Sequence, residues 1–514
     1  MDSERRKLKR TEVEHRLNEY QKLGEKFKNP PKVTLKLISK PPIGEIIGSE
    51  SVAASTAIQC YAPGVAFMKN RDDEKSLQIA ESTLEAGHHT TRLHVNYTFQ
   101  LVALTRSVTH DIFHTTPFYN SEQQSQRYVE SKDGNYLIPK DLTPEQSQFF
   151  ESACDFANKA YFEMQNLLKP AVEKRVKDMN PVGGWKVKST KERLEAKSQK
   201  ITQEIARYVL PIAQHTNYFH TISELQLLRI FRASKMPNFT SEARYVVSEM
   251  INAVKEFDPS ILDELDKPIG DLGEPDVLAS DNENFDNFLD GKLSRLISRP
   301  ETDLFKQKIV YDARLLADGY DIGMFDPVTS RLRQTFLKFA SKLSHAGDSQ
   351  RQRHRRTASN VFDIGQEYKG EHDFMTPLVI REDEDIKPIY ENIMHKMFEN
   401  VDSALEMGIP KEYATLLIPN AMNIRVIEGG DLFDWIHRWK QRLCYLAQEE
   451  IFFVSLDQVM DLEKVMPEIK PMLMAPCGIR KAVGVSPRCP EGSRWCGQPV
   501  YNWQTDEYEK HRLI

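Results

Sequence analysis

Alternation of apolar and polar residues marks one strand clearly. In the stretch RLHVNYTFQLVAL, which begins at Arg92, every second residue is apolar over nine positions. The apolar positions are Leu93, Val95, Tyr97, Phe99 and Leu101, and the polar ones between them are His94, Asn96, Thr98 and Gln100. This period of two predicts a half-buried strand over 93–101.

Helical periodicity marks two long helices. Thr143-Pro144-Glu145-Gln146 combines an N-cap residue, a proline at the first helical position and a glutamine that can complete a capping box. Apolar residues then recur at helical spacing at Phe150, Cys154, Ala157, Tyr161, Met164 and Leu168. A second helix is predicted over 386–406, with Ile389, Ile393, Met397, Val401 and Leu405 on one face and Gly408 and Pro410 beyond its end.

An internal repeat links the two halves of the chain. A predicted helix leads into IARYVLP at 205–211, and another leads into YATLLIP at 413–419. Each copy has an alanine, one variable residue, a short apolar run and a proline, and the variable residue is Arg207 in the first and Thr415 in the second. The pattern predicts a duplicated domain. The difference between Arg207 and Thr415 indicates that the two halves have different roles.

Composition suggests where the units begin and end. Residues 256–292 are rich in Asp, Pro and Gly, which is typical of a linker or excursion. A chain of 514 residues is long enough for two or more domains. We expect an exposed, charged N-terminal helix over 1–30, a first repeat over 31–260, an acidic linker over 261–298, a second repeat over 299–470 and a cysteine-containing tail over 471–514.

Charge and hydropathy exclude some classes of protein. The chain is 28% charged and 40% hydrophobic with a net charge of −6, whereas nucleic-acid-binding proteins usually carry a basic excess. No apolar run approaches the ~20 residues that span a bilayer. The charged N-terminus lacks the apolar core of a signal peptide. We therefore expect a cytoplasmic protein with no nucleic-acid or membrane partner.

One basic run stands out on this acidic background. The stretch RQRHRRTASN at 351–360 places four arginines and a histidine within six residues. Taken alone, such a run is more often a solvated or nucleic-acid-facing surface than an active site. Its meaning therefore depends on motifs elsewhere in the chain.

Four motifs along the chain, the basic run among them, together indicate what this run does. RHRRTAS at 353–359 resembles the Arg-His-Arg signature of flavin-dependent thymidylate synthases, the ThyX family, and SEQQSQRYV at 121–129 resembles the segment that normally follows it. GHHTT at 87–91 is similar to the family's upstream strand region. GGDLFDWIHRWKQRLCYLAQEEI at 429–451 is similar to its C-terminal helix, which ends in Arg, a spacer and Ala-Gln-x-Glu-Ile.

The two halves depart from the family pattern in complementary ways. The first has FHTTPFYN where Arg-His-Arg should stand, but it keeps Ser125, Arg127 and Arg207. The second keeps Arg-His-Arg and Arg442, but it has Asp363-Ile364-Gly365-Gln366 in place of Ser-x-Arg-Tyr. Aligning Pro211 with Pro419 puts Ser234 opposite Arg442. Each half has lost what the other retains.

The resemblance implies an α+β fold made of two tandem ThyX-type repeats, each an antiparallel sheet with packed helices. It implies reductive methylation of dUMP to dTMP, with FAD as cofactor and methylenetetrahydrofolate and NAD(P)H, of which NADPH is the expected form, as co-substrates. Because family members are homotetramers with sites between subunits, a fused chain would form a homodimer that mimics the tetramer. Its complete sites would lie between unlike halves.

The resemblance also implies roles for individual residues. The dUMP-binding set is Gln123, Ser125, Gln126, Arg127, Arg207, Gln350, Arg353 and Arg442. Guanidinium groups suit a phosphate because they stay charged and can bond it bidentately. Arg442 is the catalytic candidate, because a fixed cation beside N3 of uracil would favour its ionised form.

The implied cofactor set is Thr90, Arg353, His354, Arg355, Asp431, Leu432, Phe433 and His437. The family usually has Asn where Asp431 stands. An acid beside a diphosphate is unfavourable, so we expect Asp431 to face the adenosine or isoalloxazine side. Independently of the family, Trp435, Trp439, Leu443 and Leu446 form an apolar stripe, beside a charged one at Asp431, Asp434, Arg438 and Arg442.

Metal binding and two other functions are alternatives to these expectations. His88, His89 and His94 lack a matching set of carboxylates, so we expect them to be hydrogen-bonding groups and expect no metal in the active site. Cys477, Cys489 and Cys496 could hold a structural metal, but a fourth ligand is missing and buried unpaired thiols are the default. Two other functions remain open, a flavin enzyme acting on another uridine nucleotide and a nucleotide- or nucleic-acid-binding scaffold without turnover.

Overall fold

The computed structural model describes residues 3–38, 48–59, 62, 63, 67, 69, 71, 73–116, 118–180, 188–236, 239–265, 282–298, 313–317, 326, 327, 329–361 and 364–514. Asp363, part of the segment expected to replace Ser-x-Arg-Tyr, lies outside the described residues. In the part of the chain described, no helix is both long and apolar enough to cross a bilayer.

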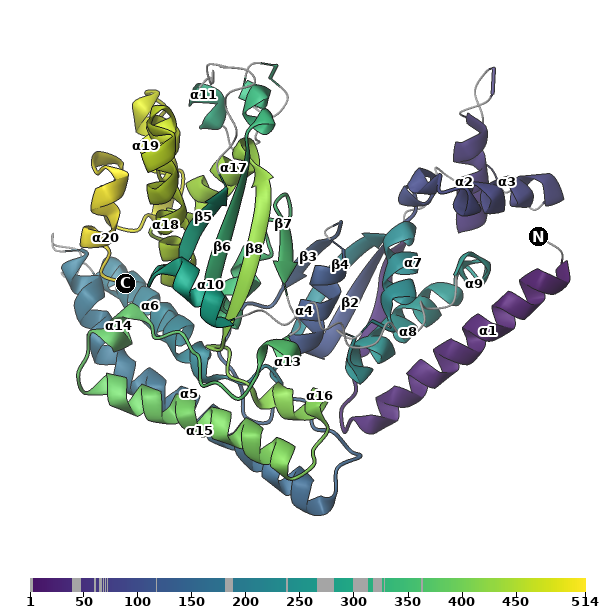
Figure 1. The fold of residues 1–514 in the computed structure, drawn as a ribbon, viewed down its shortest axis with the longest axis horizontal. Coiled ribbons are helices and arrows are strands. Elements are labelled where there is room, and N and C mark those ends of the chain that lie inside the picture. Colours follow the sequence, from purple (N-terminus) through teal and green to yellow (C-terminus); the bar gives the residue numbers. More distant parts are fainter. Residues whose placement is uncertain are drawn as a thin grey trace.

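Two four-stranded antiparallel sheets of identical topology organise the chain (Figure 1). The first has the order β1-β2-β4-β3 and the second β5-β6-β8-β7. The strands are β1 (Lys32–Ile38), β2 (Asn96–Thr105), β3 (Asn120–Gln123), β4 (His215–Ser223), β5 (Ser294–Ser298), β6 (Phe336–Ser344), β7 (Ala358–Val361) and β8 (Asn423–Asp431). The repeated order confirms the predicted duplication and the α+β class.

Helices surround both sheets (Figure 1). Those of the first half are α1 (Ser3–Lys22), α2 (Ser49–Gln59), α3 (Glu74–Glu85), α4 (Arg106–Thr115), α5 (Pro144–Asp178), α6 (Lys188–Ala206), α7 (Glu224–Ala233), α8 (Ser241–Lys255) and α9 (Ile261–Glu264). Those of the second are α10 (Asn282–Leu289), α11 (Ala313–Leu316), α12 (His345–Arg351), α13 (Ile364–Glu367), α14 (Leu378–Arg381), α15 (Ile386–Glu406), α16 (Lys411–Ala414), α17 (Leu432–Arg442), α18 (Glu449–Val465), α19 (Pro476–Ala482) and α20 (Tyr508–His511).

The predicted strand and helices are present, with corrected details. Strand β2 begins at Asn96 rather than at 93, because residues 89–93 form a 3-10 helix and Leu93 is exposed. The capping box at Thr143 forms as predicted. Helix α15 has the predicted bounds, but Ile389 and Leu405 are partly exposed, since the buried face is centred on Tyr390, Met394, Met397, Phe398 and Val401.

Two of the expected unit boundaries shift. Helix α1 is not an exposed appendage, because Val13, Leu17 and Tyr20 are buried in the core of the first half. The segment assigned to a linker contains β5, which pairs with β6 in the second sheet. It also contains Ile261 and Leu262, which pack in the first core.

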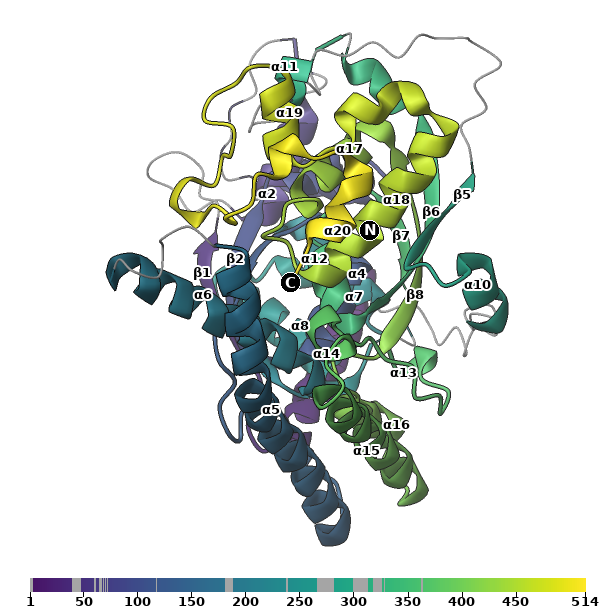
Figure 2. The ribbon, with the colours of Figure 1, turned by 90° about the vertical axis from the view of Figure 1, so that its left-hand side faces the viewer.

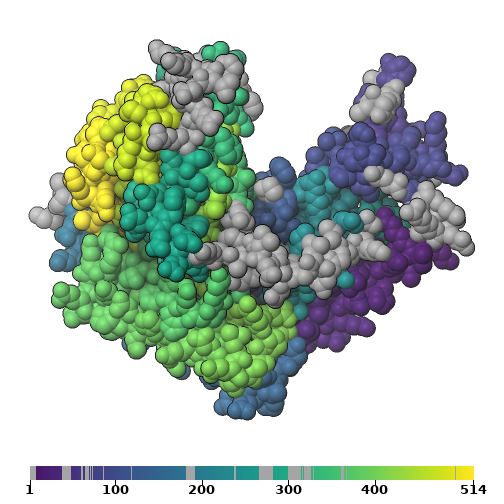
Figure 3. All heavy atoms as spheres, viewed as in Figure 1, coloured from purple at the N-terminus to yellow at the C-terminus, as the bar shows by residue number. Residues whose placement is uncertain are grey.

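The two halves share a core and are not independent bodies. One apolar cluster joins Phe27, Phe150 and Ile212 to Leu343, Phe398 and Ile418. A second joins helix α5 to helix α15, which lie side by side (Figures 1 and 2). Above these helices the surface is hollowed between the two sheets (Figure 3). Burial of apolar surface across the boundary therefore fixes how the halves meet.

Candidate active site

A cavity of about 870 Å³ lies where the first half meets the second half and its C-terminal segment. Figure 2 faces this side of the molecule, with α6 below the C-terminal helices. The first half supplies Arg127 and Glu204 to its wall, and the second supplies His437 and Arg442. Two arginines expected to share one nucleotide therefore line the same cavity, although 315 positions of sequence separate them.

Arg442 is held at the wall by the Arg-His-Arg segment. Its Nε donates to His354 Nε2 at 2.7 Å, and its Nη2 donates to the carbonyl oxygen of Gln350 at 3.2 Å. Burial, together with the charge of Arg442, keeps the pKa of His354 well below its usual value. A neutral imidazole can accept this hydrogen bond, whereas an imidazolium cannot. His354 thus positions the candidate catalytic arginine.

Positive charge is concentrated around Arg442. Burial and then the charges of Arg438, Arg127 and Arg353 lower the pKa of Arg442 to about 10. Arg127 and Arg438 each have a carboxylate partner, Glu204 and Glu428, whereas Arg442 has none among the described residues. A buried cation without a partner is costly, so the arrangement favours an anionic group beside Arg442.

Arg127 ties the two halves together beside the cavity. It forms an ion pair with Glu204 of α6, and its Nη2 donates to the carbonyl oxygen of Leu446 at 3.1 Å. Ser125 Oγ accepts from the backbone N–H of Arg127 at 3.2 Å, which closes the turn that presents the guanidinium. Gln126 Oε1 accepts from Asn420 Nδ2 at 3.2 Å.

Gln448 joins two further predicted residues. Arg207 Nη2 donates to Gln448 Oε1 at 2.6 Å, and Gln350 Nε2 donates to the same oxygen. The amide of Gln448 in turn contacts Tyr208 Oη. Sequence reasoning did not select Gln448 or Tyr208 as site residues, although both lie inside the quoted motifs.

Arg353 and Arg355 reach across to the first half. Arg353 Nη1 donates to the carbonyl oxygen of Ser121 at 2.8 Å. The guanidinium of Arg355 lies over the ring of Tyr119, 4.4 Å from its centre. Gln123, the last residue of β3, which also contains Ser121, donates to Thr216 Oγ1 at 3.3 Å. The basic run therefore faces the other repeat instead of forming an isolated solvated surface.

The remaining predicted cofactor residues occupy different environments. Asp431 caps α17 by accepting from the Asp434 N–H at 2.9 Å, and it pairs with Arg333 at 3.2 Å. The side chains of Leu432 and Phe433 are buried in the core of the second half. Thr90 is exposed on the 3-10 helix of the first half. Their roles toward a cofactor stay predictions.

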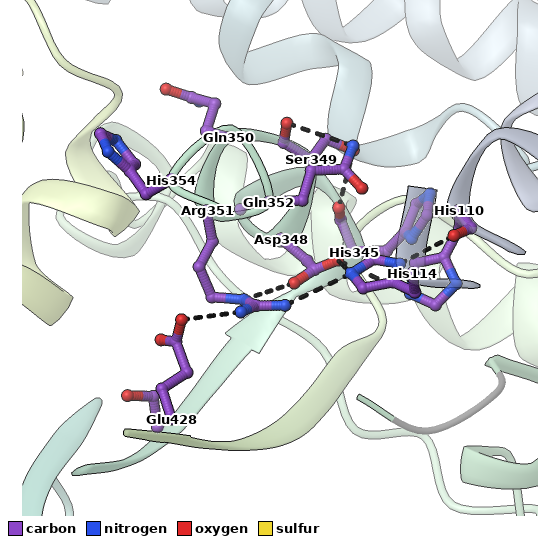
Figure 4. A network of polar contacts seen from close by, with 12 residues as sticks. His110, His114, His345, Asp348, Ser349, Gln350, Arg351, Gln352, His354 and Glu428 are labelled. Carbon is purple, nitrogen blue, oxygen red and sulfur yellow. Dashed lines mark hydrogen bonds and ion pairs between the residues drawn. The ribbon is translucent and has the colours of Figure 1, made fainter. Parts of the chain in front are cut away.

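A buried polar network supports the segment that carries Gln350 and Arg353 (Figure 4). Arg351 Nε donates to Asp348 Oδ1 at 2.6 Å, and its Nη1 donates to Glu428 Oε1 at 2.8 Å. Although burial opposes ionisation, Arg351 and the facing His114 hold the pKa of Asp348 well below its usual range. The network joins α4 of the first half to α12 and β8 of the second.

Among the described residues, one group of three or more His, Cys, Asp or Glu side chains has all its donor atoms within 4.8 Å of one another, and it lies in this network. Its members are His110, His114 and Asp348. The Arg351 guanidinium already balances the carboxylate, so we interpret the group as a structural contact between the halves. The histidines at 88, 89 and 94 do not belong to it.

The first half has no counterpart of Arg442. The equivalent residue, Ser234, exchanges a hydrogen bond with Tyr20 of α1 at 2.9 Å. Helix α1 therefore packs on the region of the first half that corresponds to the wall around Arg442.

Fold and site together define a duplicated α+β protein with a cationic cavity between unlike halves. The family model described as "Thymidylate synthase complementing protein" matches residues 43–260 and 322–468, which is more than half of the chain. The chain belongs to this family.

Individual relatives match about half of the chain. A flavin-dependent thymidylate synthase of Clostridium tetani (strain Massachusetts / E88) is 31% identical over 234 residues, which cover 45% of this chain and 85% of the relative. One from Geobacter sulfurreducens (strain ATCC 51573 / DSM 12127 / PCA) is 24% identical and covers 41% of this chain and 80% of the relative. The crystal structure of a UMP/dUMP methylase, PolB, from Streptomyces cacaoi bound with 5-Br dUMP shares 18% identity over 46% of this chain and 95% of that chain, with a TM-score of 0.31.

Proposed function

We propose that the protein converts dUMP to dTMP. In this reaction the hydrogen on C5 of uracil is replaced by a methyl group. Methylenetetrahydrofolate provides the carbon and NADPH provides the hydride. The proton lost from C5 and one proton from water balance the two N–H groups of tetrahydrofolate, which leaves together with oxidised NADP. The observation that carries the proposal is the shared cavity lined by Arg127 and Arg442. The relatives named flavin-dependent thymidylate synthase support the choice of reaction.

Polar groups near the cavity fit a nucleotide monophosphate. Within the described chain, Gln126 Nε2, Arg207 Nε and Gln350 Oε1 are buried without hydrogen-bond partners. A buried polar group without a partner costs about 1–3 kcal/mol, and a nucleotide offers both acceptors and donors. Arg127 and Arg207, with Ser125, would bind the phosphate, while Gln350 and Arg353 would bind from the second half.

Arg442 would act on the base. Its hydrogen bonds to His354 and to the Gln350 carbonyl fix the guanidinium before substrate arrives. A preorganised cation beside N3 of uracil stabilises the anion that forms when N3 loses its proton, and electron density then rises at C5. The lowered pKa of Arg442 indicates that this cation gains from a neighbouring negative charge.

The residues expected at the cofactor have the chemistry that FAD requires. Arg353, His354, Arg355 and His437 would hold it, since guanidinium groups pair with a diphosphate and His354 lies against Arg442. When bound, FAD would pass the hydride from NADPH toward the transferred carbon. Arg355 is already oriented by its contact with Tyr119.

The test is product analysis with purified protein. dTMP should form when dUMP, FAD, methylenetetrahydrofolate and NADPH are all present, and no product should form when any one is omitted. Formation of a methylated product from UMP but not from dUMP would assign the enzyme to another uridine nucleotide. A colourless protein that forms no product and shifts on a nucleic-acid gel would instead be a scaffold.

A further inference from the structure

Four cysteines meet beside the candidate active site. Cys444, Cys477, Cys489 and Cys496 all line one small cavity of about 20 Å³. The chain contains only six cysteines, so most of its thiols gather at this one place. A cavity of this size admits about one water molecule or one ion.

The four thiols come from separate segments. Cys444 follows the end of α17, two residues after Arg442, and Cys477 lies in the first turn of α19. Cys489 and Cys496 lie in the irregular segment between α19 and α20. This convergence supplies the fourth ligand that the sequence pattern of Cys477, Cys489 and Cys496 lacked.

The thiols are free, three of them are partly buried and Cys496 is buried. None of the four is in a disulfide, and Cys496 is buried in a segment whose neighbours are mostly exposed.

We propose that these four cysteines bind one Zn²⁺ ion as a structural site. Four thiolates in a tetrahedron are a closed, structural set of zinc ligands. No three of the four sulfur atoms lie within 4.8 Å of one another in the structure. With Zn–S bonds of about 2.3 Å they would stand about 3.8 Å apart, so the segment must close in around the ion.

The site would fasten the C-terminal segment to the active-site wall. That segment also contacts the first half, where Lys197 Nζ donates to the Cys496 carbonyl oxygen at 2.9 Å and Gln498 Nε2 donates to the Met179 carbonyl oxygen at 2.6 Å. Arg480 and Arg494 of the same segment line the 870 Å³ cavity. A metal at Cys444 would thus connect this wall to the helix that ends in Arg442. The inference does not depend on which reaction the cavity supports.

The test is metal content of the full chain, purified under reducing conditions and measured by inductively coupled plasma mass spectrometry. The expected result is about one zinc per chain and loss of most of it in Cys477→Ser and Cys489→Ser. The matched control is Cys154→Ala, a buried cysteine on α5 outside the cavity, which should keep its zinc. Replacement by Co²⁺ should give the intense near-ultraviolet thiolate-to-metal absorption of a tetrahedral site, which reports ligation even if a variant folds poorly.

Three outcomes would overturn the proposal. One is a folded wild-type chain without stoichiometric metal that takes up neither Zn²⁺ nor Co²⁺. Another is iron with acid-labile sulfide in place of zinc. The third is a disulfide among the four cysteines, detected by mass spectrometry after alkylation without reduction. Binding of dUMP, measured on the same samples by calorimetry, separates failure of the metal site from failure of the proposed function.

Discussion

Pro211 and Pro419, equivalent positions in the two repeats, face each other in an antiparallel bridge. Ile212 N–H donates to the Ile418 carbonyl at 2.9 Å, and the symmetry-related Asn420 N–H donates to the Leu210 carbonyl at 2.8 Å. A pseudo-twofold axis therefore passes between these prolines. The motifs that revealed the repeat in the sequence lie at the axis, which is why residues from both halves reach one cavity.

Glu242 and Glu450 occupy equivalent positions in the two repeats, so substitutions at both test the pseudo-twofold relationship. Glu242 accepts from Thr105 Oγ1 at 2.7 Å, and Glu450 accepts from Ser344 Oγ at 2.6 Å, so each holds the start of a helix. Replacement of either by Gln should lower the free energy of unfolding by about 1–3 kcal/mol. Only Glu450 also accepts from Tyr208 Oη, which contacts Gln448. Denaturant titration and calorimetry should show similar losses of stability, with weaker dUMP binding in Glu450→Gln alone.

Arg127→Ala should weaken binding of dUMP about 10- to 100-fold, because it removes a charged hydrogen bond to phosphate. The control is Arg229→Ala, which removes an exposed arginine of α7 that does not line the 870 Å³ cavity. Isothermal calorimetry measures both affinities. Unchanged affinity in Arg127→Ala would remove this arginine from the phosphate site.

Acid should destabilise the first half through His220. Burial, with a contribution from Arg355, lowers the pKa of His220 to about 3, below an unfolded value of about 6.5. Between about pH 3 and pH 6.5 the imidazole of His220 is therefore protonated in the unfolded chain but stays neutral in the folded chain. The stability contributed by this group is complete above pH 6.5 and is lost as the pH falls toward 3.

The change to test is His220→Phe, which keeps the ring that stacks on Phe113. Between pH 7 and pH 5 the wild type should lose about 2 kcal/mol more unfolding free energy than the variant, at about 1.4 kcal/mol per pH unit. Urea unfolding at the two pH values measures the difference. Parallel losses in both proteins would show that His220 is not desolvated.

Light scattering after size exclusion should give twice the mass of the chain. The expectation rests on the tetramer of single repeats that the resemblance to the family implies. Two fused chains would supply four repeats. A monomer that forms dTMP at full rate would show that the cavity within one chain is sufficient.

Much of this fold could be predicted from the sequence, because its signals are local. The alternation around Tyr97, the capping box at Thr143 and the stripe of Trp435 and Trp439 each reflect contacts within one element. The repeat at 205–211 and 413–419 predicted duplication, and the identical sheet orders confirm it.

Contacts between distant segments could not be predicted in the same way. Gln448 was visible in a motif, but only the fold shows that it joins Arg207 to Gln350. Cys444 follows the helix of Arg442 in the sequence, and only the fold places Cys477, Cys489 and Cys496 beside it. The network of His114, Asp348 and Arg351 likewise forms across the pseudo-twofold axis, where no sequence spacing indicates contact.

The most direct test of the central claim is a crystal structure of the protein with dUMP. The account predicts the phosphate within hydrogen-bonding distance of Arg127, and the uracil ring beside Arg442. Residues of both repeats would then contact one nucleotide. A nucleotide bound by residues of a single repeat, with Arg127 and Arg442 both remote from it, would contradict the account.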